Sequence, residues 1–499
     1  MFDAESSFNK YNESAESAGN SKWNSWLPGR KVTPTREGEA TTRQKIVYLE
    51  GLRGVAALMV AVSHYVEATI MYSPAHAENV TQNQSRFWNL FYNGHWAVTI
   101  FFLLSGRVLP LGIFSSPSPV RTTAAAAFRR PFRLALPVVA ASIIVIIAGA
   151  GGAWKHLAAA DIIFETPFWS AVAPDHTAFG GLGGFIIYIS NLLTRPSASV
   201  MEAAALSKLY PLGVIWTIPL EYLNSNLVYL FAIIILGVAP DDHRKRRFGL
   251  YAVMIFYLWW NTSWTATFFM GMVLADLTVS GRMATWRLQL GQLKGNLMAI
   301  PLLVFAVVLL TVGGVSRGVD EGTNSWVIYH GVKGFEGGPA QVTEPTTSVT
   351  ISAALSLIAI EFSPVMQWIF SSPPIAFLGK ISFGLYLLHG ITLLGVMPQY
   401  FSYADERMSF WGMWISGLVI FLLLAAAQGA IFYVAIDKTS VRFARWLHQA
   451  LFAKPMHRSL RFGKEATVPL ADNGQSEIAI STVGRAERTN GLDAWSAGR

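Results

Sequence analysis

The sequence predicts an all-α integral membrane protein, a bundle of transmembrane helices that crosses the bilayer many times. Of its 499 residues, 52% are hydrophobic and only 14% are charged, whereas a soluble domain carries about 25% charged residues. Apolar runs long enough to span a bilayer, about 20 residues each, recur along the chain. They lie near residues 46–66, 94–114, 134–153, 212–238, 297–315, 350–370, 375–397 and 410–436.

The segment 249–275 decides how many times the chain crosses. It is uncharged throughout but interrupted by polar residues at 261–263, so it can form one long helix or two short ones. With two helices, every basic stretch falls on one side of the membrane, as cytosolic loops do. These basic stretches are 121–133, 244–247, 282–294 and 442–461. We therefore expect about ten spans, with both termini in the cytosol.

The chain divides into four parts. Residues 1–45 form a polar cytosolic arm without the apolar core of a secretory signal, and residues 46–440 form the membrane domain. Residues 441–464 are basic with interleaved aromatics, which indicates an amphipathic juxtamembrane helix on the inner leaflet. Residues 465–499 are polar and rich in small residues, which is typical of a disordered tail.

Composition and short motifs limit the function and the location. The net charge of +8 follows from the basic loops of a membrane protein, so we expect no nucleic-acid partner. The absence of cysteine excludes thiolate metal sites and cysteine nucleophiles, and we expect no metal. Three sequons, at Asn79, Asn83 and Asn261, fall outside the cytosol in the ten-span arrangement. They indicate a glycoprotein of an endomembrane or of the plasma membrane.

The first predicted span carries ionisable residues, which cost roughly 2.5–3.5 kcal/mol each at the centre of a bilayer. Arg53 and His64 are eleven residues apart, about three helical turns, and so share one face about 16 Å apart. Glu50 lies three residues before Arg53, where the two can pair. On one interpretation, this is a juxtamembrane salt bridge with an interface histidine. On the other, Arg53 binds an anionic cofactor and His64 acts as a general base, since imidazole titrates near pH 6.5.

Five stretches resemble, in family order, the motifs of the acyltransferase 3 family of integral membrane O-acyltransferases. They are residues 49–54 followed by His64, then 101–106, 129–134, 216–221 and 378–389. In the first stretch, Arg53 and His64 match the family's spacing of an arginine, ten residues and a histidine. The chain departs from the family pattern at Glu50, where Asp is usual, at residues 218–220, and at Arg107. These departures bear on the choice of substrate.

The resemblance implies transfer of an acyl group, usually acetyl, from an acyl-CoA such as acetyl-CoA to a hydroxyl group. The acceptor would be a glycan, a small hydroxylated metabolite or a lipid. The residues to which the resemblance gives a catalytic role are His64 as general base, Arg53 and Glu221. The residues that it assigns to donor binding are Arg53, Arg129, Arg130 and Arg133.

Other interpretations stay open at the level of sequence. Positive-inside bias alone accounts for the arginines of 129–133, and Glu221 can form a structural salt bridge within the bundle. Glu67, one turn after His64, either orients the imidazole or faces water, and His389 can be structural or functional. The alternative function is a multi-span transporter that uses intramembrane Arg, Glu and His for proton coupling, although the chain shows no internal repeat.

Overall fold

The computed structural model describes residues 46–71, 90–175, 177, 180–194, 208–238, 244–260, 263–313 and 347–452. The regular elements of these residues are all helical, which confirms the all-α class. In chain order they are α2 (Val47–Val66), η2 (Glu67–Met71), α5 (Gly94–Val108), α6 (Leu111–Phe114), α7 (Pro119–Ala150), α8 (Leu157–Ile163), α9 (Phe168–Ala171), α10 (Leu182–Thr194), η3 (Pro211–Trp216), α12 (Thr217–Val238), α13 (Arg244–Trp260), α14 (Thr265–Val279), α15 (Arg282–Gly313), α16 (Thr347–Phe362), α17 (Pro364–Phe370), α18 (Pro373–Gly395), α19 (Met397–Ala404), α20 (Phe410–Phe432), η5 (Tyr433–Asp437) and α21 (Lys438–Phe452).

Six helical stretches of the described residues are long and apolar enough to cross a membrane, and a seventh if α16 and α17 count as one bent span. The six are Gly94–Phe114, Pro119–Ala150, Pro211–Val238, Arg282–Thr311, Pro373–Ala404 and Phe410–Phe452. The protein is therefore a polytopic membrane protein. The count of ten and the cytosolic placement of both termini stay predictions, because no membrane defines the two sides.

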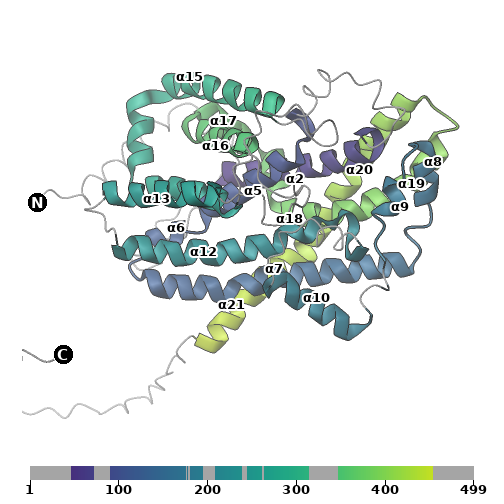
Figure 1. Ribbon diagram of the computed structural model, residues 1–499, viewed down its shortest axis with the longest axis horizontal. Coiled ribbons are helices and arrows are strands. Elements are labelled where there is room, and N and C mark those ends of the chain that lie inside the picture. The colour runs from purple at the N-terminus through teal and green to yellow at the C-terminus, as the bar shows by residue number, and fades with distance from the viewer. Residues whose placement is uncertain are drawn as a thin grey trace, which may run out of the picture. The chain divides into compact units, whose positions relative to one another are not determined.

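Helix α2 is not one of these six stretches, although it lies in the middle of the bundle. It packs most extensively against α18 and also contacts α5. Figure 1 shows these three helices between α15–α17 on one side and α7 with α12 on the other. Because neighbouring helices surround α2, its ionisable residues meet protein more than lipid, and this lowers the cost of carrying them.

Glycines let the backbones of α2 and α18 approach closely. A Cβ on Gly54 would lie 2.4 Å from the amide nitrogen of Gly379, and one on Gly379 would lie 2.2 Å from the carbonyl oxygen of Glu50. Helices α5 and α14 meet in the same way, since a Cβ on Gly106 would lie 1.9 Å from the carbonyl oxygen of Phe268. Small residues at such crossings are typical of helix packing in membranes.

The segment 249–275 forms two helices, α13 and α14, as the charge pattern predicted. The apolar run 350–370, which is long enough for one span, forms two helices with a sharp bend between them. Here the chain bends by 101° between α16 and α17. Ser363 adopts an extended conformation and its side chain accepts a hydrogen bond from the amide of Met366, and Pro364 has no amide hydrogen to continue α16. The serine and proline therefore end one helix and begin another.

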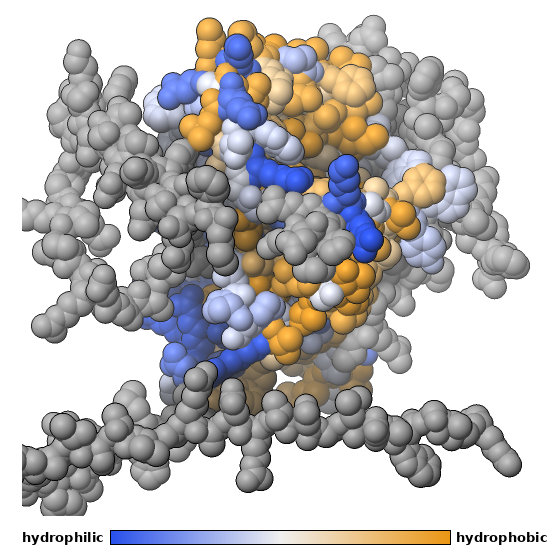
Figure 2. Space-filling model, turned by 90° about the vertical axis from the view of Figure 1, so that its left-hand side faces the viewer, coloured by the Kyte–Doolittle hydropathy of each residue, from blue (hydrophilic) through white to orange (hydrophobic). Residues whose placement is uncertain are grey.

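The basic stretch 121–133 is helical, because α7 begins at Pro119 and carries the arginines on its first half. Figure 2 looks onto the left-hand end of Figure 1, where α13 begins, and shows hydrophilic patches among hydrophobic side chains. Exposed basic residues of α13 include Lys245 and Arg246. Basic side chains are therefore exposed where α13 begins, within the stretch 244–247 that the sequence predicts to be cytosolic.

Helix α15 has two limbs that meet at Gly291, where φ is +69°. Figure 1 shows the first limb crossing the left-hand end of the bundle and the second limb running along it. At the C-terminal end, α20 continues through η5 into α21, so the predicted basic segment 441–464 is helical as far as Phe452. Residues 1–45, 453–499 and the sequons at Asn79, Asn83 and Asn261 lie outside the described residues.

Candidate active site

His64 lies in the last turn of α2 with part of its side chain open, 23% exposed. Its ring stacks on that of His389 from α18, with 5.3 Å between ring centroids and 17° between ring planes. The close packing of α2 on α18 thus brings together two histidines that are more than 300 positions apart in the chain. The motif of residues 378–389 contributes to the same place as the first motif.

Glu67 faces His64 from the next turn. The Nδ1 atom of His64 lies 3.4 Å from the Oε2 atom of Glu67, and the Glu67 side chain is 14% exposed. The hydroxyl of Ser63 donates a hydrogen bond to the other carboxylate oxygen, at 3.0 Å. Glu67 also begins the π-helical turn η2, in which the chain winds more widely. A carboxylate at Nδ1 favours a proton on that nitrogen and leaves Nε2 as the basic atom.

His389 is fully buried and differs from His64 in its partners. Its Nδ1 atom lies 3.2 Å from the carbonyl oxygen of Leu385, one turn back on α18. Among the described residues, its Nε2 atom is buried without a hydrogen-bond partner. Burial without a charged partner favours the neutral form of a side chain, so His389 offers His64 a neutral aromatic surface.

Tyr386 holds the motif of residues 216–221 against α18. Its hydroxyl donates to the carbonyl oxygen of Val214 at 2.7 Å and lies 3.0 Å from the hydroxyl of Thr217. The Tyr386 ring also lies 6.2 Å from that of His389. The start of α12 is therefore attached to the helix that carries His389.

A second group of charges surrounds Arg53, near the other end of α2. The charges that act on its guanidinium come from Glu221, Arg130, Glu50 and Asp437. Those that act on Arg133 come from Arg130, Arg53 and Asp437. We call the residues Arg53, Arg130, Arg133 and Glu221 the Arg53 cluster.

Glu221 has two partners within the Arg53 cluster and its surroundings. It forms an ion pair with Arg130 and accepts a hydrogen bond from the hydroxyl of Ser105 at 2.8 Å. Arg53 and Arg133 form no ion pair with a carboxylate anywhere in the described part of the chain. The side chain of Arg133 is exposed. Two guanidinium groups of this cluster can thus accept an external anion.

The predicted residues separate into two places. Arg53, Arg130, Arg133 and Glu221 share one, whereas His64 is about 16 Å along the helix axis from Arg53. Arg129 is the exception, because the charge that acts on it most is that of Arg445 in α21. A substrate that uses both places must be extended along α2.

The sequence motifs did not single out Glu361, a fully buried carboxylate in α16. The Nε atom of Arg107 donates to its Oε1 at 2.9 Å, and Arg287 and the hydroxyl of Tyr48 donate to its Oε2. Two features of the sequence could have indicated it. An acidic residue stands inside the apolar run 350–370, and Arg107 breaks the family pattern, so each needs a partner of opposite charge.

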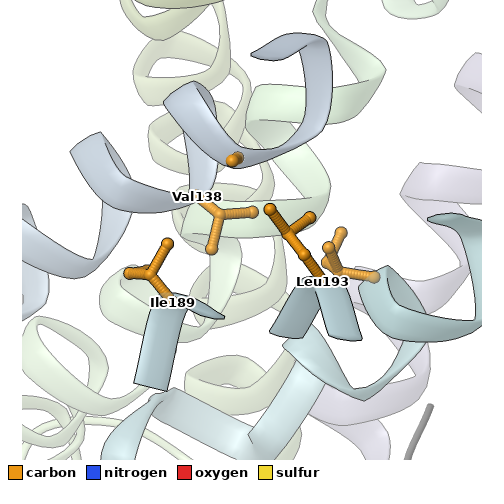
Figure 3. Close-up of a pocket in the computed structure, with 5 residues that line it drawn as sticks. Val138, Ile189 and Leu193 are labelled. Carbon is orange, nitrogen blue, oxygen red and sulfur yellow. The ribbon is translucent and has the colours of Figure 1, made fainter. Parts of the chain in front are cut away.

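Other features of the described residues do not resemble a site for a charged donor. A small depression between α7, α10 and α12 is lined by apolar side chains, among them Val138, Ile189 and Leu193 (Figure 3). It offers no group for phosphates. Within the described ranges, no three His, Asp or Glu residues are placed to hold a metal ion.

Fold and site define a polytopic membrane protein that holds a histidine–carboxylate pair and a separate arginine cluster within one helical bundle. A family model described as an acyltransferase domain, that of acyltransferase 3, matches residues 46–429. The protein therefore belongs to the acyltransferase 3 family and is an integral membrane acyltransferase. Comparison with curated proteins and with solved structures found no significant match.

Proposed function

We propose that this acyltransferase moves an acyl group from acyl-CoA to a hydroxyl of a glycan, a small hydroxylated metabolite or a lipid, and that the acyl group is acetyl. The observation that carries the proposal is the division of α2 into two ends. His64 faces Glu67 at one end, and Arg53 with Arg133 lies at the other. Coenzyme A has a similar division, since its phosphates and its thioester lie at opposite ends of the pantetheine arm.

The Arg53 cluster suits the phosphates of the donor. Guanidinium groups bind phosphate oxygens through charge-assisted hydrogen bonds, and Arg53 and Arg133 have no carboxylate within ion-pair distance in the described part of the chain. Arg130 is held by Glu221. We assign direct phosphate contact to Arg53 and Arg133, and a supporting charge to Arg130 and Arg129.

Glu221 then has a positioning role. Its carboxylate joins α12 to α7 through Arg130 and to α5 through Ser105. This arrangement fixes the first half of α7, on which Arg133 also lies. Loss of the Glu221 carboxylate would leave Arg130 as a buried charge without its partner, which is costly.

The reaction needs two proton transfers, one from the acceptor hydroxyl to His64 and one from His64 to the leaving thiolate. The acceptor hydroxyl attacks the thioester carbonyl, and Nε2 of His64 takes the hydroxyl proton as the new C–O bond forms. The tetrahedral intermediate collapses with cleavage of the C–S bond. The imidazolium, held by Glu67, then returns the proton to the leaving thiolate of coenzyme A. The neutral ring of His389 supports the His64 ring throughout.

A complementation experiment tests the proposal. Glycans, lipids and small metabolites of a deletion strain are compared with those of the parent for a lost acetyl increment. Wild-type protein should restore the product, and His64→Ala should not, at equal membrane abundance. His448→Ala is the matched control, because His448 lies on α21 beside Phe128 and belongs neither to the contacts of His64 nor to the Arg53 cluster. Restoration of the product by His64→Ala would refute the role of His64. In a parallel assay with labelled acetyl-CoA, uptake of the label without an acetylated product would indicate transport.

A further inference from the structure

A buried charge cluster lies apart from the residues of the proposed reaction. We call Arg107, Arg287, Glu361 and Tyr48 the Glu361 cluster. Arg107 is 1% exposed, and its Nη2 atom also donates to the hydroxyl of Thr278 at 2.7 Å. Arg287 comes from the first limb of α15, and its side chain is 35% exposed. The cluster is therefore deeply buried at Arg107 and open at Arg287.

The Glu361 cluster is not electrically balanced. It holds two guanidinium groups and one carboxylate, and Tyr48 uses its hydroxyl as a donor to that carboxylate. Its net charge is thus +1. A second buried pair, Arg247 with Asp276 at 2.9 Å, has one charge of each sign. An unbalanced charge in a membrane protein is expensive unless an anion accompanies it.

Two donors of the cluster lack an acceptor in the part of the chain that the structure describes. Among the described residues, Nη1 of Arg107 and Nε of Arg287 are buried without a hydrogen-bond partner. Each unsatisfied buried group requires an explanation, and an ion is one of the usual ones. Here the unsatisfied groups are guanidinium N–H groups beside a surplus positive charge. A bound anion would balance the surplus positive charge and accept hydrogen bonds from the two unpaired N–H groups.

We propose that the Glu361 cluster is a binding site for a phosphate group. Arginine is the side chain best suited to phosphate, since its planar fork donates two parallel hydrogen bonds. The partly exposed Arg287 gives the phosphate access from outside, and Arg107 supplies the buried charge. Tyr48 and Arg53 are five residues apart on α2, so they point about 140° apart around the helix axis. The site is therefore separate from the Arg53 cluster, and it does not rest on the proposed reaction.

Phosphate binding to full-length protein in detergent tests this site. The midpoint of thermal unfolding is measured against sodium phosphate, with sodium chloride of equal ionic strength as the reference. A ligand that binds only the folded state stabilises it by RT ln(1 + [L]/Kd), so the dependence of the midpoint on phosphate concentration gives Kd. We expect a rise in the midpoint for the wild-type protein and at least a tenfold higher Kd for Arg287→Met, which changes a partly exposed residue and should fold. Arg107→Met should have the same effect.

Two further variants separate binding from structure. Glu361→Gln removes the competing negative charge, so the same site should bind phosphate more tightly, with at least a threefold lower Kd. A merely structural cluster would lose stability in both Glu361→Gln and Arg287→Met without opposite changes in Kd. Arg247→Met disturbs a balanced buried pair of similar depth and should leave the Kd for phosphate unchanged.

The origin of the phosphate follows from two additional measurements. Coenzyme A that competes with phosphate in the wild-type protein but not in Arg287→Met would assign the group to the donor. A higher unfolding midpoint in phosphatidylglycerol nanodiscs than in phosphatidylcholine nanodiscs, lost in Arg287→Met, would assign it to a phospholipid headgroup. No stabilisation of the wild-type protein by phosphate over chloride would overturn the proposal, as would an equal Kd for Arg287→Met and wild type. None of these measurements depends on acyl transfer, so the two proposals fail separately.

Discussion

Replacement of Glu67 by Gln tests how much the carboxylate contributes to a base at His64. The substitution keeps the size of the side chain and an oxygen that can accept from Ser63, but it removes the charge 3.4 Å from Nδ1 of His64. Two unit charges at this distance interact by about 5 kcal/mol at an effective dielectric of 20. Both side chains are partly open to solvent, which screens the pair, so we expect about 1–3 kcal/mol in the transition state.

That range corresponds to a loss in turnover of about 5- to 150-fold, since each 1.36 kcal/mol changes a rate tenfold. The assay is the initial rate of acetyl transfer from labelled acetyl-CoA with purified protein in nanodiscs, once an acceptor has been identified. Glu67→Asp should recover part of the loss. Glu406→Gln is the matched control, because Glu406 belongs to an exposed ion pair with Arg407.

The decisive measurement is a double-mutant cycle. If Glu67 acts through His64, then Glu67→Gln in the His64→Ala background should lower the residual rate by less than twofold. Losses that multiply in the double variant would show that the carboxylate acts elsewhere. Full turnover of Glu67→Gln would remove the carboxylate from the mechanism, although His64 could still be the base.

Three further predictions follow from the same geometry. Arg133→Ala should raise the KM for acyl-CoA about 10- to 100-fold with little change in kcat, because a hydrogen bond to a charged group contributes about 1.5–3 kcal/mol; an unchanged KM would exclude this contact. Gly54→Ala should lower the free energy of unfolding by about 1–3 kcal/mol through overpacking against α18, whereas Gly249→Ala, which meets no atom within 4 Å, should not. His389→Phe keeps the ring beneath His64 and removes a buried nitrogen without a partner, so it should keep turnover within about tenfold and stabilise the protein by about 1 kcal/mol; a loss as large as that of His64→Ala would make that nitrogen catalytic.

Much of the fold could be predicted because bilayer physics acts on local sequence. Apolar length and charge placement are local properties, and they correctly separated α13 from α14. The bend between α16 and α17 was not predicted, because hydropathy is averaged over a window of residues. The window gives no weight to a single Ser363-Pro364 step, although one proline is enough to end a helix. Backbone rules applied to residues 350–370 would have found this break.

The candidate site could be predicted along one helix but not between helices. Helical periodicity placed Arg53 and His64 on one face of α2 without any tertiary information. The partner of Glu221 lies on α7 and the partner of Arg107 on α16, and such pairs depend on how helices pack. A charged residue within an apolar run indicates that it has a partner of opposite charge, but only the structure shows which residue that partner is.

The ionisable residues of α2 and its position in the bundle explain each other. A helix that carries Glu50, Arg53 and His64 is a poor membrane span by composition, and it is not among the six apolar stretches. Its glycines allow α18 to approach within backbone contact, and its neighbours shield it from lipid. Apolar length and hydropathy therefore do not single out the helix on which the proposed chemistry depends. In this bundle, α18 and α5 pack against α2, and α2 in turn carries Glu50, Arg53 and His64, the ionisable residues that the proposed chemistry requires.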